Sequence, residues 1–536
     1  DGVNPAGGAA GGDPQLASTF AVGEEAAMAV GRGGRGGAGA AGEAVPVWGP
    51  LDKVPVTVTR GEDVRVDVVV RTRGVGHFFP GGTVDAFDVW LELRAVDDNG
   101  RTVFWSGVAQ DGGAGPVDEG AHFYGSRMVD AHGNRIDKRN AWSTRAVAWV
   151  NLIPPGAADV AHFRIHVPED CGDRIHLEAR LNYRKFSEAN TMFSFAGVPA
   201  PGTSSGPESV TPHYDDRPFI AGEVPANVSA ELREIPELPI VVMHRAEAEL
   251  HVAAAGAAVE NTALVRPGDA LRWNDYGIGL LRQGDLSGAR RAFENVAQAD
   301  LTYADAPVNL ARVALREGLL DDAAVALEEA LALDADLPKA HYFLGVTAKE
   351  RGQYDEALER FREAAETYPR DRVVRNAIGR TLFLQRRYEE AVAELRQVLA
   401  IDAEDLMAHY NLMLCYKGLG REEDAERERK LYERFKADED APAILGPYLR
   451  ENPGDNRMRQ PIHEQRSAPR ELIERELALR ESRGEPHVVL PGEGAAYARK
   501  VMERGERERT RIAADRIQGP VEADVVRPVE LGEGTH

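Results

Sequence analysis

Three histidines in the N-terminal half of the chain could act as metal or haem ligands. His77 lies between Gly76 and Phe78 in a glycine- and aromatic-rich run, and His122 and His132 follow it. A neutral imidazole is a good ligand for iron or zinc. The three histidines do not show a ligand spacing such as His-x-x-x-His on one helix. Turn-capping or buried, hydrogen-bonded histidines are therefore the main alternative.

The turn around His132 also carries oxygen ligands at alternating positions. Asp130, Asn134 and Asp137 could contribute to a calcium loop. A complete calcium loop needs more oxygen ligands and a terminal bidentate glutamate. The sequence therefore predicts a turn held by Asx hydrogen bonds.

The two cysteines exclude haem attachment by this polypeptide. Covalent attachment of a c-type haem needs Cys-x-x-Cys-His. Cys171 is followed by Gly172-Asp173-Arg174, and Cys415 lies far away in a helical stretch. No P-loop occurs, and the one run that fits Gly-x-Ser-x-Gly, Gly202–Gly206, lies in a Pro/Gly/Ser-rich stretch. We therefore expect no catalytic residue.

Composition and net charge argue against some classes of binding partner. The chain has 536 residues and a formal net charge of −23, which argues against a general nucleic-acid binder because such proteins need basic faces. No apolar run approaches the roughly 20 residues that span a bilayer. The chain begins at Asp1 without a methionine, as a processed or excised piece would, so the lack of a signal peptide does not indicate a compartment.

The elements that must position the histidines are predicted to be β-strands. Residues 1–53 are rich in Gly and Ala and are expected to be flexible. From 54 to 255 the hydrophobic period is two, as in Val64–Val70 and Val89–Leu93, with a turn signal about every ten residues. This pattern favours an antiparallel β-sandwich.

A second pattern begins near residue 265 and predicts a different architecture. Alanines recur every 34 residues at Ala289, Ala323, Ala357, Ala391 and Ala425. In most units a small residue precedes the alanine by twelve positions and an aromatic or leucine follows four positions later. The period and phase resemble the tetratricopeptide repeat (TPR) family. The resemblance implies five helix pairs over 265–437, stacked into a solenoid with a concave groove, and so an α+β multidomain protein.

The TPR resemblance also suggests which side chains line the groove. The family's phase places them on the first helix of each unit: Asn274, Arg312, Tyr342, Lys349, Asn376, Arg380, Tyr410 and Lys417. Arginine and lysine among asparagine and tyrosine would suit an extended acidic or C-terminal peptide. The alternative is that they are solvated helix positions. Residues 438–536 are expected to form a charged, Pro/Gly-punctuated tail, with one helix over Glu471–Arg483.

The β-region carries a second resemblance, to the β-domain of bacterial multihaem c-type cytochrome/TPR proteins. The similar segments are Val75–Gly82, Asp85–Leu93, His122–Tyr124, Gly133–Trp142, Leu152–Ala157, Leu181–Phe186, Ile235–Val242 and Gln460–Glu464. In that family a haem-rich segment precedes the β-domain. The resemblance implies that His77, or after it His122, is an axial ligand or contact to a haem c on a partner chain or a missing segment.

The two resemblances together predict a noncatalytic scaffold of an extracytoplasmic multihaem cytochrome assembly that takes part in electron transfer. The protein is then expected to be bacterial and periplasmic or extracellular, with a protein partner or a second copy in the TPR groove. One alternative is a general protein-assembly or glycan-binding protein with no redox role. Another is a metal-dependent enzyme centred on His77, His122 and His132.

Overall fold

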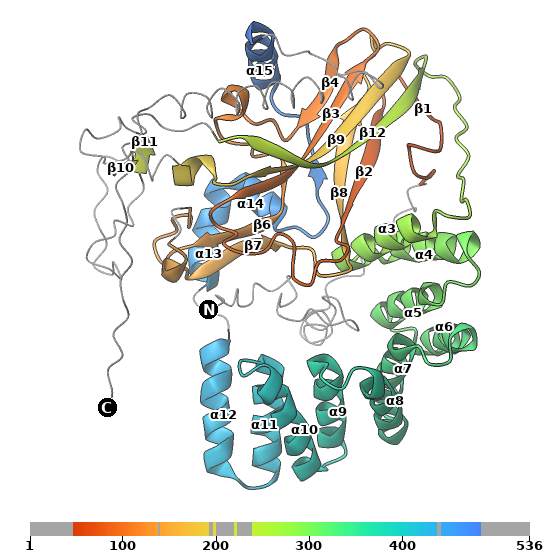
Figure 1. The fold of residues 1–536 in the computed structure, drawn as a ribbon, viewed down its shortest axis with the longest axis vertical. Helices are drawn as coiled ribbons and strands as arrows, with labels where there is room; N and C mark the ends of the chain where they lie inside the picture. The colour runs from red at the N-terminus through yellow and green to blue at the C-terminus, as the bar shows by residue number, and fades with distance from the viewer. Residues whose placement is uncertain are drawn as a thin grey trace, which may run out of the picture. The chain divides into compact units, whose positions relative to one another are not determined.

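The computed structural model describes residues 47–137, 140–191, 238–436 and 441–483, with the backbone of strands β10 (Gly197–Pro199) and β11 (Phe219–Ala221). Figure 1 shows a β-rich region and an array of helices. Nearly all of the Gly/Ala-rich segment expected at 1–53 lies outside the described residues. Among the helices described, none is long and apolar enough to cross a membrane.

The β-rich region is built on one large sheet and smaller ones. The large sheet has the order β1-β12-β9-β3-β4, with β5 on β3; its strands are β1 (Val56–Thr59), β3 (Asp88–Asp97), β4 (Thr102–Ser106), β5 (His122–Phe123), β9 (Arg174–Arg184) and β12 (Ile240–Ala253). A second sheet has the order β13-β8-β2, formed by β2 (Asp63–Arg71), β8 (Ala158–His166) and β13 (Glu464–Gln465). Strands β6 (Gly125–Val129) and β7 (Ala146–Asn151) pair separately.

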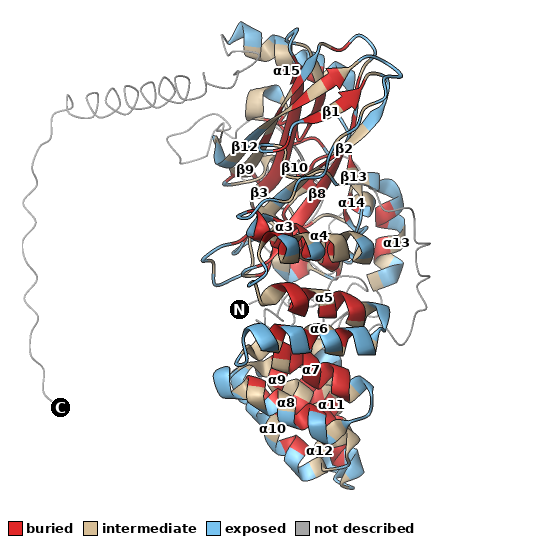
Figure 2. Cartoon of the chain, turned by 90° about the vertical axis from the view of Figure 1, so that its right-hand side faces the viewer, coloured by how far each residue is buried: buried red, intermediate tan, exposed pale blue. Residues whose placement is uncertain are grey.

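The core of this region follows from strand alternation. Ile175, Leu177 and Ala179 are buried at every second position of β9, and they share one hydrophobic cluster with residues of β3 and β8. Burial is concentrated on these strands (Figure 2). Strand β3 is buried on both faces, and Trp90 donates its Nε1–H to the Gly107 carbonyl at 3.0 Å.

The expected antiparallel β-sandwich is not confirmed. The β-rich region is a curled sheet, or half-barrel, and it includes the parallel pairs β1–β12 and β13–β8. Both parallel pairs join strands that are far apart in sequence. Hydrophobic periodicity reports which face of a strand is buried, and it does not report such long-range pairing.

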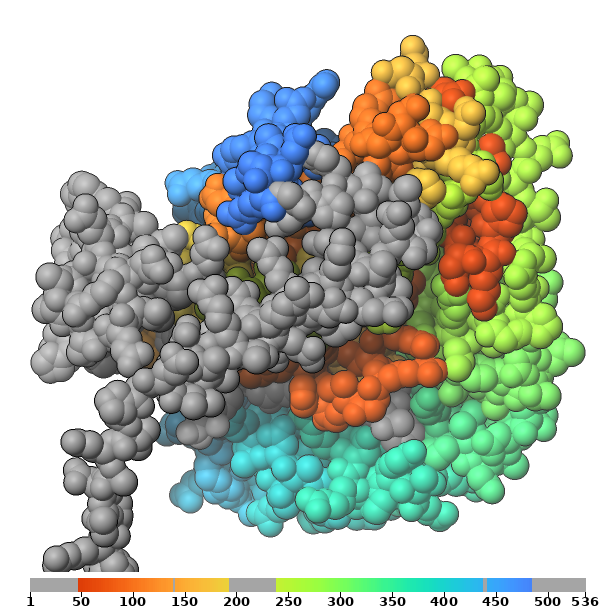
Figure 3. Space-filling model, turned by 45° about the horizontal axis from the view of Figure 1, so that its top comes forward, coloured from red at the N-terminus to blue at the C-terminus, as the bar shows by residue number. Residues whose placement is uncertain are grey.

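C-terminal segments belong to the β-rich region. Helices α13 (Ala441–Glu451) and α14 (Pro453–Met458) follow the array, and β13 and α15 (Arg470–Ser482) come after them. Figure 3 shows the blue residues of α15 beside orange residues of the β-rich region. Trp105 donates its backbone N–H to Ser467 Oγ at 3.1 Å, across this contact. The described part of the expected tail therefore contains three helices and a short strand between Ala441 and Ser482.

The repeat array consists of helix pairs of nearly constant length. The first helices of the pairs are α3 (Ala270–Gln283), α5 (Asp305–Glu317), α7 (Pro338–Glu350), α9 (Arg372–Leu384) and α11 (Leu406–Gly418). The second helices are α4 (Leu286–Ala299), α6 (Leu320–Leu333), α8 (Tyr354–Thr367), α10 (Tyr388–Ile401) and α12 (Glu422–Phe435).

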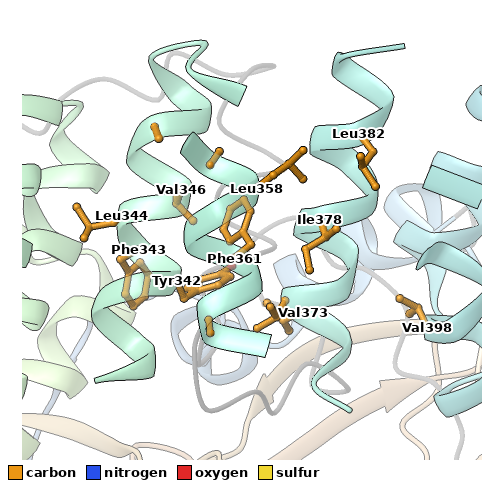
Figure 4. Close-up of a cluster of buried hydrophobic side chains, with 14 of the residues drawn as sticks. Tyr342, Phe343, Leu344, Val346, Leu358, Phe361, Val373, Ile378, Leu382 and Val398 are labelled. Atoms are coloured by element: carbon orange, nitrogen blue, oxygen red, sulfur yellow. The ribbon is translucent and has the colours of Figure 1, made fainter. Parts of the chain in front are cut away.

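The spacing of small and large residues explains how the two helices of a pair pack. All five repeated alanines are at most 1% exposed. A Cβ atom placed on Gly345 would lie 2.7 Å from the Phe361 ring, and one on Gly379 would lie 2.7 Å from Leu395. The glycine twelve positions before the alanine thus receives the large side chain four positions after it. Figure 4 shows Phe361 in this cluster, beside Tyr342.

Candidate functional site

The first candidate site is a set of mostly buried polar side chains on the first helices and in the turn before α11, which we call the polar ladder; its hydrogen bonds join α3 to α5 and α9 to α11. Its members are Asn274, Asn309, Arg312, Asn376, Arg380, Asp405 and Asn411. Between α3 and α5, Asn309 Nδ2 donates to Asn274 Oδ1 at 2.8 Å. Between α9 and α11, Asn376 Nδ2 lies 3.2 Å from both oxygens of Asp405.

Two arginines of the polar ladder hold equivalent positions, eleven residues before Ala323 and Ala391. Arg312 Nη1 donates to Asn309 Oδ1 at 2.6 Å, and its guanidinium lies 5.7 Å from the Phe343 ring centre. The Arg312 side chain is largely buried. An amide oxygen and an aromatic face therefore orient the guanidinium.

Arg380, two units later, has the same kinds of contact but from different helices, since its amide partner lies on the next first helix and its ring on its own helix. Its Nη1 donates to Asn411 Oδ1 at 3.2 Å, and the guanidinium lies 4.9 Å from the Phe383 ring centre. Arg372 on the same helix differs, because its Nη1 lies 2.6 Å from a carboxylate oxygen of Asp402. Arg380 thus contacts an amide oxygen and an aromatic ring, whereas Arg372 forms an ion pair.

The remaining groove candidates differ in accessibility. The Tyr342 side chain is buried and packs against Phe343 and Phe361, with ring centres 5.1 and 5.6 Å away. Tyr410 is half-buried, and its ring centre lies 5.3 Å from that of Tyr432. Lys349 lies 3.5 Å from Glu350 and Lys417 is exposed.

Several first and second helices of the repeats differ in charge. Helix α9 contains three arginines and no carboxylate, whereas α6 contains four carboxylates and no basic residue. Helix α7 has two lysines and one glutamate. The first helices therefore offer cationic and amide groups within a strongly acidic protein.

The 34-residue phase of the repeats did not predict every member of the polar ladder. Asn309 lies fourteen positions before its repeated alanine, whereas Asn274 and Asn376 lie fifteen positions before theirs. This shift of one residue hides Asn309 from a strict 34-residue alignment. Asp405 lies in the turn before α11, where it also caps the helix by accepting the Ala408 N–H at 2.8 Å.

His77 occupies an exposed loop before β3. Its Nδ1 lies 2.7 Å from the Phe78 carbonyl oxygen, so Nδ1–H is the donor. Within the described residues no hydrogen bond to Nε2 is present. A Cβ on Gly81 would lie 2.8 Å from His77 Nδ1, so a larger residue there would displace the imidazole from its present position. A neutral imidazole with Nδ1–H bonded to a carbonyl and Nε2 open fits an axial ligand.

His122 lies in a buried network and has both ring nitrogens engaged. Its Nε2 is 2.8 Å from Asp159 Oδ2 and 3.1 Å from Asn151 Nδ2, and its Nδ1 is 3.2 Å from Gln465 Nε2. The His122 ring also stacks on His463, with ring centres 5.5 Å apart. Coordination by either nitrogen would require these contacts to break, so His122 fits a ligand role less well than His77.

Burial and the neighbouring groups shift the pKa values of titratable side chains in this network. Burial alone would raise the pKa of Asp159, but the hydrogen bond and charge of His122 hold it well below its usual range. Burial and the neighbouring His122 lower the pKa of His463 to about 4. Burial and Asp159 raise the pKa of Tyr124 well above its usual value. Asp159, His463 and Gln465 were not predicted, because β8 and the C-terminal segment meet only in the folded protein.

His132 belongs to a turn, as predicted. Asp130 Oδ1 accepts the backbone N–H groups of His132 and Asn134, both at 2.8 Å, and Oδ2 accepts Asn134 Nδ2 at 3.0 Å. These are the expected Asx hydrogen bonds. Across the described residues, no group of three or more His, Cys, Asp or Glu side chains could hold a metal ion.

Comparison with known families identifies the repeats. Models of the tetratricopeptide repeat match residues 275–340, 314–381 and 374–405. The helix pairs of this protein are therefore TPR units.

Comparison with curated proteins finds the cytochrome c-type biogenesis protein CycH of Rhizobium meliloti (strain 1021). The two are 32% identical over 121 residues, which cover 22% of this chain and 31% of CycH. The chain thus matches about a third of the length of that relative.

Solved structures of other TPR proteins are similar to part of the chain. MamA is 21% identical, covers 33% of this chain and 95% of its own, and has a TM-score of 0.28. YrrB, described as "a TPR protein with an unusual peptide-binding site", is 20% identical, with coverages of 34% and 92% and a TM-score of 0.28.

Proposed function

We propose that this protein is a noncatalytic scaffold of an extracytoplasmic multihaem cytochrome assembly that transfers electrons. In this proposal the TPR array binds a partner chain or peptide, and the β-rich region contacts a haem carried by a partner or by another segment. The setting is the bacterial periplasm or the cell exterior. The interaction role rests on the TPR units, and the haem role rests on His77 and on a relative that matches over part of its length.

The polar ladder is the observation that carries the interaction role. Arg312 and Arg380 are each oriented by an amide oxygen and an aromatic ring. A guanidinium has five N–H donors and can form charge-assisted, bidentate hydrogen bonds with a carboxylate. Ordering these side chains before binding reduces the entropy lost when a partner docks. An acidic segment or the C-terminus of a polypeptide is the partner chemistry that fits.

Substitution of the two arginines tests this role. We expect R312Q/R380Q to bind a glutamate-rich decapeptide at least tenfold more weakly than the unchanged protein in fluorescence anisotropy. A hydrogen bond to a charged group contributes about 1.5–3 kcal/mol, and 1.4 kcal/mol corresponds to about tenfold in affinity. Amidation of the peptide C-terminus separates recognition of side-chain carboxylates from recognition of the terminal one.

The matched control removes an arginine from the second helix of a TPR unit, outside the polar ladder. Arg429 on α12 pairs with Glu426 and Glu433 on the surface of the same helix. R429Q should leave peptide affinity within about twofold. If R429Q weakens binding as much as R312Q/R380Q, the effect is general electrostatics and the polar ladder is not the binding site.

Two observations support the haem role, beside the expected resemblance of the β-rich region to multihaem cytochrome/TPR proteins. His77 has Nδ1–H bonded to the Phe78 carbonyl, which leaves Nε2 for a ligand. CycH, a relative over part of its length, is named as a cytochrome c-type biogenesis protein. A haem bound there would supply one-electron transfer. This protein would contribute a neutral imidazole held in orientation by a backbone carbonyl.

A spectroscopic experiment tests the haem role. We expect the assembly purified from its native host to show a Soret band, and we expect H77A to shift that band or the reduction potential. The control is H166A, since His166 is also exposed and lies 2.9 Å from Asp63. An assembly without Soret absorption, or identical spectra for H77A and H166A, would contradict the haem role.

A general assembly protein without redox function is the second candidate. The polar ladder supports it equally, because those side chains do not include His77. Loss of peptide binding in R312Q/R380Q together with no effect of H77A would select this second candidate. The two experiments therefore separate the interaction role from the haem role.

A further inference from the structure

Residues 441–479, which we call the strap, return from the far end of the repeat array to the β-rich region. Helix α13 packs on β7, where Leu445, Tyr448 and Leu449 share a hydrophobic cluster with Val129 and Trp149. The array is therefore followed in sequence by a segment that folds onto the part of the protein that precedes the array.

A buried carboxylate fixes α14 to strands β6 and β7. Asp455 is 6% exposed. Its Oδ1 accepts the Trp149 Nε1–H at 2.9 Å and lies 3.4 Å from Arg127 Nε, and Oδ2 lies 3.3 Å from Arg135 Nη2. Tyr448 of α13 also donates to Asp455. Burial raises the pKa of Asp455, but Arg127 and Arg135 more than offset this and keep it below the usual value.

The middle of the strap adds a short strand and a buried amide. Strand β13 pairs parallel with β8, with Glu464 opposite His162 and Gln465 opposite Phe163. Gln465 is fully buried, and its Nε2 lies 3.2 Å from His122 Nδ1. Further along, the Ala468 N–H donates to the Trp105 carbonyl at 2.8 Å.

A second buried carboxylate fixes α15. Glu476 is 1% exposed, and its two oxygens accept the backbone N–H groups of Asp111 and Gly112 at 2.8 and 2.9 Å. Ile473 packs with Trp105 in a small hydrophobic cluster. Asp455 and Glu476 thus anchor the strap at two separate places on the β-rich region.

The first helix of the array is anchored on the same region. Arg282 of α3 donates to the carbonyls of Ala158 and Leu152 at 2.8 and 3.0 Å. Tyr276 donates to Asp67 Oδ2 at 2.7 Å. A Cβ on Gly279 would lie 2.5 Å from Val160, so α3 and β8 are in close contact.

The distal end of the array is connected to the strap by the polypeptide chain itself. A polypeptide extends at most about 3.6 Å per residue, so the end of α12 at Phe435 lies within roughly 20 Å of the start of α13 at Ala441. TPR units contact only their neighbours, so small changes between units add up to large changes in curvature. A tether at both ends removes this freedom.

We propose that the strap is a clasp that closes the repeat array against the β-rich region and holds the partner-binding surface at one curvature. The array is then an insertion within a discontinuous domain, and release of the strap frees its distal end. The clasp requires neither a particular partner nor haem.

Distance measurements on the full-length protein test the clasp. Spin labels on E62C and E423C report the distance between the β-rich region and α12, and a second pair, E62C and E294C, reports the proximal end. These positions are exposed, whereas both native cysteines are buried and burial raises their pKa, to about 11 for Cys415. Added labels should therefore react selectively.

The test variant is D455A/E476A, which removes both anchoring carboxylates. We expect the width of the E62C–E423C distance distribution to increase at least twofold, with E62C–E294C unchanged. The control E474A removes an exposed partner of Arg470 on α15 and should alter neither pair. An unchanged E62C–E423C distribution would overturn the clasp. Broadening of both pairs would also overturn it, because the two carboxylates would then hold the proximal end of the array as much as the distal end.

Discussion

At the scale of single residues, the repeat array depends on close contact between a glycine and a ring. A Cβ on Gly345 would lie 2.7 Å from Phe361, whereas one on Gly446 in α13 would meet nothing closer than 3.9 Å. Overpacking costs about 1–3 kcal/mol, and replacing helical glycine with alanine gains up to about 1 kcal/mol. We expect G345A to lower the free energy of unfolding in urea by about 1–2 kcal/mol.

G446A serves as the matched substitution for this test. It should leave stability unchanged or raise it by up to about 1 kcal/mol, because only the gain in helix propensity applies. Equal effects of G345A and G446A would show that the glycine–ring contact does not limit packing in the array.

A buried histidine makes the last repeat pH-dependent. His409 Nδ1 is 2.7 Å from Glu428 Oε2, and Nε2 is 3.0 Å from the Ala403 carbonyl, so both nitrogens act as donors. Burial lowers the pKa of His409, but these two contacts more than offset it, and the net pKa is raised. The stabilisation is therefore fully present below the usual histidine pKa of about 6.5 and is lost as pH rises through the folded-state pKa.

We expect the difference in unfolding free energy between the unchanged protein and H409Q to be largest near pH 6. The difference should decrease between about pH 6 and pH 9 in urea titrations. H166Q, at an exposed histidine of the β-rich region, should show no comparable trend in the unfolding of the array. Parallel pH profiles for the unchanged protein and H409Q would contradict the charged state assigned to His409.

At the scale of elements, the side chains that cap helices differ in how many other groups they also bind. Asp285 caps α4 by accepting the Gly288 N–H at 2.9 Å. Asp405 caps α11 and also lies 3.2 Å from Arg372 Nη1 and from Asn376 Nδ2. A cap contributes about 1 kcal/mol, and leaving buried polar groups unpaired costs about 1–3 kcal/mol more.

D405A should therefore destabilise the array by about 2–4 kcal/mol, and D285A by about 1 kcal/mol. Urea unfolding followed by circular dichroism would measure both. Similar losses for the two variants would mean that the contacts from Arg372 and Asn376 add little to the cap.

The helical elements were predictable because each TPR unit repeats the same contacts between small and large side chains. Ala357, Gly345 and Phe361 recur at fixed offsets, so the sequence alone predicts where the helices touch. Members of the polar ladder were predicted in part: Arg312 and Arg380 follow the phase, while Asn309 is shifted by one position. The role of Tyr342 depends on packing against Phe361, which phase alone does not reveal.

The β-rich elements were less predictable, because their pairing is long-range. Strand β12 pairs antiparallel with β9 and parallel with β1, over very different sequence separations. Strand β13 has two residues and no periodicity, yet its Gln465 contacts His122. Contacts of this kind depend on the folded protein and leave no local pattern in the sequence.

At the scale of the whole molecule, the strap makes the β-rich region discontinuous. Without residues 441–479, the apolar surfaces of Trp149 and Trp105 would lose the partners that cover them. The array, in contrast, has its own continuous core from Val308 to Ala425. We therefore expect a fragment of residues 265–436 to fold as a helical array.

A fragment of residues 47–255 should not fold stably by itself, because Arg127 and Arg135 would lack Asp455 and the backbone N–H groups at 111 and 112 would lack Glu476. We expect this fragment to bind the dye ANS and to unfold without a cooperative thermal transition. Joining residues 47–255 to 441–483 through a short glycine-serine linker should restore a cooperative transition. The same fusion carrying D455A/E476A should keep a cooperative transition but at a lower temperature, because the apolar contacts around Trp149 and Trp105 remain. Cooperative unfolding of 47–255 alone, at the temperature of the fusion, would show that the β-rich region is complete without the strap.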